Sequence, residues 1–120
     1  MSIARTSLFA TLLTIPLYAN AGEWTGTLVD TMCYGKNKAN IGNDHNGGAA
    51  KGCATACAKM GIPVAVLVDG KMYTIAAPSK TLADVMGKTA TISGNLVDGS
   101  VIVPEKVMVD GKEVKTSGMM

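Results

Sequence analysis

The chain has 120 residues, 11 of them basic and nine acidic, and its net charge at neutral pH is +2. A charge this small offers little to a phosphate backbone, and aromatic residues, on which bases could stack, make up only 4% of the chain. Composition therefore argues against nucleic-acid binding.

Residues 1–21 have the three-part pattern of a cleavable secretory signal peptide. Arg5 gives the positive start, an uncharged run extends from Ser7 to Tyr18, and Ala19-Asn20-Ala21 places small residues where a signal peptidase cuts. The apolar run is shorter than the roughly 20 residues that span a bilayer. We therefore expect export to the periplasm or the medium, with no stable membrane insertion after cleavage; an uncleaved N-terminal anchor is the alternative.

Residues 22–120 would then be the mature protein. This part has 99 residues, with ten lysines against nine acidic residues and no arginine. Its length suits one small domain, and a domain of this size often needs a disulfide or a bound metal in addition to its core for stability.

The mature chain opens with a strand and a polar segment. The alternating residues Glu23–Asp30 predict the first strand. Glycine, asparagine and charged residues dominate Cys33–Gly48, which predicts a long loop. The alanine-rich segment Ala49–Met60 predicts a helix that stops at Gly61.

Four more strands and one short helix follow. The strands are expected at Val64–Val68, Lys71–Ala76, Lys88–Val97 and Ser100–Val109. Asp-Gly pairs at 69–70 and 98–99 supply hairpin turns, and a third pair at 110–111 offers another turn before a frayed end. The short helix should run from Pro78 to Met86, and Pro104 should mark a bulge or an edge in the last strand.

Five strands with a helix between the third and the fourth match the order of an OB-fold, a small Greek-key barrel. The expected fold class is therefore mainly β: a five-stranded OB-like barrel in which the Cys-bearing helix is inserted between strands one and two. The whole of 22–120 would form a single domain, with the Cys/His insertion at about 33–61. An open β-meander packed on the two helices is the alternative.

Three cysteines and the only histidine lie close together in the sequence. Cys33, His45, Cys53 and Cys57 follow the spacing C-x11-H-x7-C-x3-C. Cysteines four apart on a helix place both sulfurs on one face. Thiolate and imidazole ligands suit Cu(I) or Zn(II), so the four residues form a candidate metal site, with copper ahead of zinc.

The neighbours of these four residues offer further candidates. Met32 and Met60 are adjacent in sequence to this segment and could add thioether ligands for copper. Asp30 either ends the first strand in a turn or accepts a hydrogen bond from His45. His45 itself could instead be a solvated residue of a polar loop.

A disulfide is the competing interpretation of the cysteines. Thiols oxidise in exported proteins, and Cys33 could pair with either Cys53 or Cys57, leaving one thiol over. The motif for covalent haem, C-x2-C-H, is absent, and so is the C-x2-C of a thiol-exchange site. We expect no haem and no nucleotide.

Several motifs in order resemble a known group of proteins. They are G-T-L-V-D-x-x-C at Gly26–Cys33, the single histidine, C-x3-C, G-I-P-V-A-V-L-V-D-G-K-x-Y at Gly61–Tyr73 and G-K-x-A-T-I-S-G at Gly87–Gly94. The pattern is similar to a group of small exported bacterial proteins of unknown function that are thought to be OB-like barrels. The resemblance spans most of the mature chain and implies an architecture and a Cys/His segment, but no reaction.

These observations lead to three functional hypotheses. The first is a non-enzymatic exported domain whose Cys/His cluster binds a soft metal ion in the cell envelope. The second is a disulfide-stapled structural or interaction module whose partner is an envelope protein. The third is a thiol-redox protein.

Overall fold

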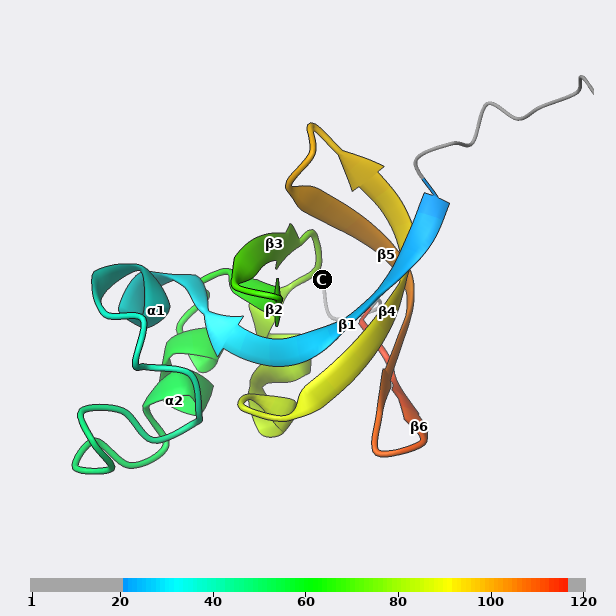
Figure 1. Cartoon of the computed structure of the whole chain (residues 1–120). Coiled ribbons are helices and arrows are strands. Elements are labelled where there is room, and N and C mark those ends of the chain that lie inside the picture. Colours follow the sequence, from blue (N-terminus) through cyan, green and yellow to red (C-terminus); the bar gives the residue numbers. More distant parts are fainter. Residues whose placement is uncertain (1–20, 117–120) are drawn as a thin grey trace, which may run out of the picture.

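A computed structural model describes residues 21–116, so the expected signal peptide, apart from Ala21, lies outside the described residues. The strands and helices are arranged as in Figure 1. Their bounds are β1 Ala21–Asp30, α1 Thr31–Lys36, α2 Cys53–Lys59, β2 Val64–Val68, β3 Lys71–Ile75, the 3-10 helix η2 Ser79–Val85, β4 Thr89–Val97, β5 Val101–Val109 and β6 Lys112–Val114.

Five of the strands close into a barrel. The sheet order is β3-β2-β1-β4-β5-β6, and β3 pairs in addition with β5. That closing contact is parallel, between Thr74 and Val101 and between Ile75 and Ile102, whereas all other strand pairs are antiparallel. With α2 between β1 and β2, and η2 between β3 and β4, the expected OB-like barrel is confirmed and the open meander is wrong.

Two glycines let the strands of the barrel approach closely. A Cβ at Gly26 would collide with the backbone carbonyl oxygen of Leu67 in β2, and one at Gly94 with that of Val103 in β5. The register shifts at the second position, because Ser93 faces Lys106 while Gly94 faces Pro104. The bulge expected at Pro104 is therefore present.

The core fills the barrel and is closed at one end by the helices. Side chains of alternate strand residues point inward, and those of α2 and η2 cover them. The buried cluster contains Leu28, Ala54, Ala58, Val64, Val66, Ile75, Leu82, Ala83, Met86, Ala90, Ile92, Ile102, Val107 and Val109. On the other face of β1 and β2, a smaller cluster of Val29, Tyr34 and Ala65 anchors α1. The residues of α1 and α2 thus gather at one end of the barrel, away from β6 (Figure 1).

Three elements differ from the sequence expectations. The segment expected to be a loop from Cys33 begins inside a short helix, α1. The helix expected from Ala49 starts only at Cys53, because Gly52 adopts a left-handed conformation (φ +62°) that an α-helix cannot contain. Beyond the third Asp-Gly turn, β6 pairs with β5. Within residues 21–116, no helix is long and apolar enough to cross a membrane.

Candidate metal centre

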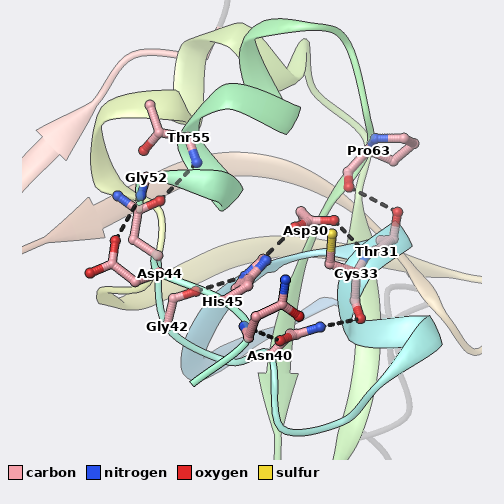
Figure 2. A network of polar contacts seen from close by, with 12 residues as sticks. Asp30, Thr31, Cys33, Asn40, Gly42, Asp44, His45, Gly52, Thr55 and Pro63 are labelled. Carbon is pink, nitrogen blue, oxygen red and sulfur yellow. Dashed lines mark hydrogen bonds and ion pairs between the residues drawn. The ribbon is translucent and has the colours of Figure 1, made fainter. Parts of the chain in front are cut away.

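Asp30 connects the barrel to the first cysteine. It is the last residue of β1, it is fully buried, and its Oδ1 accepts a hydrogen bond from the backbone N–H of Cys33 at 2.7 Å. This is the N-cap contact of α1, which satisfies a backbone donor that the helix leaves unpaired. The cap places Cys33 in the first turn of the helix, at the end of the barrel (Figure 2).

The polar loop after α1 is ordered by its own hydrogen bonds. The Asn40 side chain donates to the carbonyl of Cys33 and accepts from the N–H of Asn46. His45 and Ala50 exchange two backbone hydrogen bonds, of 2.8 and 2.9 Å. The side chain of His45 is consequently turned inward and only 2% exposed, so its interpretation as a solvated loop residue is wrong.

The same loop also caps α2. The N-cap residue Gly52 has no side chain to offer, and its own N–H donates to Oδ1 of Asp44 at 2.7 Å. Asn43 accepts twice from the first turn: its carbonyl oxygen from Ala54, and its Oδ1 from Thr55 at 2.8 Å. These contacts fix the start of α2, and with it the positions of both cysteines on this helix.

The three cysteine sulfurs converge from the two helices. Sγ of Cys33, from α1, and those of Cys53 and Cys57, from α2, all lie within 4.8 Å of one another. Three thiolates that share one ion at about 2.3 Å are roughly 3.8 Å apart, so only small shifts would close this group around a metal. Cys57 is buried and the other two are half-buried; the three thiols are free in the structure.

A second group of ligand atoms adjoins the first. Asp30, Cys33 and His45 also place a carboxylate oxygen, a sulfur and a ring nitrogen within 4.8 Å of one another. Figure 2 shows His45 between the Gly42 carbonyl, 3.0 Å from Nε2, and the Asp30 carboxylate, whose Oδ2 is 3.9 Å from Nε2. Three of the four predicted ligands thus form one group. The fourth, His45, is grouped with Cys33 and not with the cysteines of α2.

The surroundings keep two of the thiols protonated. Burial, and then the nearby Asp30 carboxylate, raise the pKa of Cys33 from 9.0 to about 12. Burial followed by the same carboxylate also raises the pKa of Cys57. Nucleophilic and redox-active cysteines need a lowered pKa, so this environment does not favour thiol-redox chemistry. It does suit a cation, which gains from the negative charge of Asp30 and can displace the thiol protons.

Sequence reasoning missed part of this centre. The sequence pattern indicates Asp30 only as a turn former or a partner of His45, whereas its position three residues before Cys33 is the signal of an N-cap. Met32 and Met60, considered as extra copper ligands, have side chains 44% and 73% exposed. They are at the surface around the site.

The chain matches no protein-family model, no curated protein and no solved structure in comparisons with all three. The centre is therefore interpreted from its own geometry and chemistry.

Proposed function

We propose that this protein is an exported, non-enzymatic binding domain that holds a soft metal ion in the cell envelope, Cu(I) in preference to Zn(II). The observation that carries the proposal is the convergence of Cys33, Cys53 and Cys57 from two separate helices onto one point. A purely structural role would not require three thiols within 4.8 Å, because a disulfide uses two.

The donor set favours copper. Thiolate sulfur is a soft ligand that selects Cu(I), whereas a structural zinc site is almost always four-coordinate. Three sulfurs satisfy Cu(I) without a further ligand. Zinc in the same place would need a fourth, and His45, our predicted one, is grouped with Cys33 and Asp30. The half-buried thiols of Cys33 and Cys53 leave a path by which an ion could enter and leave.

The proposed location in the cell envelope is based on residues 1–21. The signal-peptide pattern of residues 1–21 supports export, and an envelope location gives a copper-binding domain access to ions that cross the outer layers of the cell. The same location exposes thiols to oxidation.

A disulfide-stapled interaction module is the second candidate. The cysteine sulfurs are close enough that Cys33 could be joined to Cys53 or Cys57 after small movements. Such a bridge would close a loop of 20 to 24 residues and stabilise the fold by roughly 3 kcal/mol. It would also consume two of the three metal ligands, so the two functions are separable by experiment.

The test is a titration of the reduced mature domain with Cu(I) against a competing chelator. We expect one tightly bound Cu(I), and its loss in the Cys53→Ser/Cys57→Ser double variant. Met60→Leu, which removes an exposed thioether three residues after Cys57, is the control and should bind as the wild type does. Equal affinities of wild type and double variant would overturn the proposal. Isolated protein two hydrogens lighter than the reduced chain, with no metal uptake after reduction, would support the disulfide module.

A further inference from the structure

Two buried polar side chains next to the three-sulfur site have atoms without a partner. Asp30 is fully buried and His45 is 2% exposed. Oδ2 of Asp30 and Nδ1 of His45 are the only buried side-chain oxygen or nitrogen atoms in residues 21–116 that lack a hydrogen bond. Nearly all buried polar atoms in proteins are paired, and an exception points to a bound water or ion or to a functional role.

The two residues lie close together without a direct hydrogen bond. Oδ2 of Asp30 is 3.9 Å from Nε2 of His45, which is too long for a hydrogen bond. A carboxylate oxygen of Asp30, the sulfur of Cys33 and a ring nitrogen of His45 nevertheless all lie within 4.8 Å of one another, which is close enough for the three residues to hold one ion after small movements.

His45 is held in the way a metal ligand usually is. The carbonyl of Gly42 only accepts hydrogen bonds, so Nε2 of His45, 3.0 Å away, carries the hydrogen and the neutral ring keeps a lone pair on Nδ1. A ligating histidine commonly donates its other N–H to a backbone carbonyl or a carboxylate, which fixes the ring.

Charge balance gives an independent reason for a second cation. Three thiolates around one Cu(I) carry a net charge of −2, and the fully buried carboxylate of Asp30 makes it −3. Buried charges in proteins are compensated, by ion pairs or by metals. Among residues 21–116, Asp30 has no lysine within salt-bridge distance, and its one basic neighbour is the ring of His45. A divalent ion beside the first would reduce the net charge to −1.

We infer that Asp30, Cys33 and His45 form a second metal position, which takes a borderline divalent ion of the Zn(II) class and shares the Cys33 thiolate with the three-sulfur site. The mixed oxygen, nitrogen and sulfur donors suit Zn(II), whereas the all-sulfur group suits Cu(I). The inference rests on the proposed function, because the two ions share Cys33 as a ligand. The thiol of Cys33 loses its proton when either ion binds.

The test uses the wild-type mature domain first. It is loaded with one equivalent of Cu(I) and titrated with Zn(II), and the mass of the complex is measured by native mass spectrometry. We expect a species with one copper and one zinc. Binding of one copper with no zinc, or of a second copper in place of zinc, would overturn the second position and leave the first intact. Failure to bind any copper would instead contradict the proposed function.

Two variants locate the second ion. Asp30→Asn keeps an oxygen that can cap α1 but loses the carboxylate, and His45→Gln loses the imidazole. Each should weaken Zn(II) binding roughly tenfold or more and keep the uptake of one Cu(I), which also reports that the site is folded. Asp69→Asn is the matched control: this exposed acidic residue is in the turn between β2 and β3, outside the ligand group, and the variant should bind zinc as the wild type does. Unchanged zinc affinity in both test variants would overturn the inference.

Discussion

Cys33 is the residue at which the two groups of ligand atoms meet. Its backbone N–H is fixed by Asp30, and its carbonyl accepts from Asn40. Its sulfur lies within 4.8 Å of the sulfurs of Cys53 and Cys57, and also within 4.8 Å of a carboxylate oxygen of Asp30 and a ring nitrogen of His45. The pKa of this thiol, raised to about 12 chiefly by burial, means that the metal-free site keeps its proton at neutral pH.

Metal affinity should therefore depend steeply on pH. Between pH 6 and 8 the thiols of Cys33 and Cys57 are protonated, because the pKa of each is raised above 9.0. Binding displaces at least these two protons, so the apparent Cu(I) affinity should rise by at least about two orders of magnitude per pH unit. Chelator competition at pH 6, 7 and 8, corrected for the chelator's own titration, measures this slope. An affinity that is flat across the range would contradict the thiolate site.

At the scale of secondary-structure elements, the polar loop is a scaffold for α2. Gly52 leaves this helix without a side-chain cap, and Asn43 supplies one from nine residues earlier in the sequence. The next residue, Asp44, accepts a hydrogen bond from the backbone N–H of Gly52. The loop thereby determines where Cys53 and Cys57 point.

Removing the Asn43 cap should weaken both the fold and the site. Asn43→Ala loses the acceptor for Thr55, at a cost of about 1 kcal/mol, which corresponds to a fall in Tm of roughly 4–8 °C for a domain of this size. We expect Cu(I) affinity to fall as well, because the first turn of α2, which positions Cys53 and Cys57, is no longer held in place. Asn43→Asp keeps an acceptor oxygen and should stay close to wild type. Thermal unfolding and Cu(I) competition on the three proteins provide the measurement; an alanine variant that melts with the wild type would exclude this capping role.

The elements that could be predicted are those with local signals. Alternating residues between Asp-Gly pairs predicted the strands, and all three turn aspartates do adopt positive φ, between 49° and 54°. The C-x3-C spacing predicted that the sulfurs of α2 share a face. In contrast, α1 has only six residues, too few for a helical periodicity, and its one local signal is the cap Asp30, three residues before Cys33. The burial of His45 depends on the bridge to Ala50, which no periodicity reveals.

For the whole molecule, the barrel is closed by a contact of only two residue pairs. The parallel β3–β5 register joins β3, which the other pairings would leave as an edge strand, to the start of β5, which β6 does not cover. The strands must curl tightly for this closure, and β1 passes close to β2 at Gly26, where there is no space for a side chain. Small residues at such points are a condition of the fold.

A methyl group at Gly26 should therefore destabilise the barrel. Gly26→Ala forces Cβ against the Leu67 carbonyl, which belongs to the paired backbone of β2 and cannot move independently. We expect a loss of about 1–3 kcal/mol in the free energy of unfolding. Gly35→Ala is the control, since nothing lies within 4 Å of its added Cβ and alanine favours the helix α1. Denaturant titration measures both; equal destabilisation by the two variants would refute the steric argument.

The cysteine group also determines which bonds a protease can reach. The segment between α1 and α2 covers residues 37–52, so an ion held by cysteines of both helices joins the two helices at its ends. Lys36, Lys38 and Lys51, in and beside this segment, are exposed. Trypsin needs a locally unfolded stretch of chain, and fixed ends make that opening rarer. Metal-loaded protein should therefore resist trypsin at these lysines more than metal-free protein does, while cleavage at the distant Lys112 stays unchanged. The digestion pattern would then report, in a crude cell-envelope extract, whether the protein carries its ion.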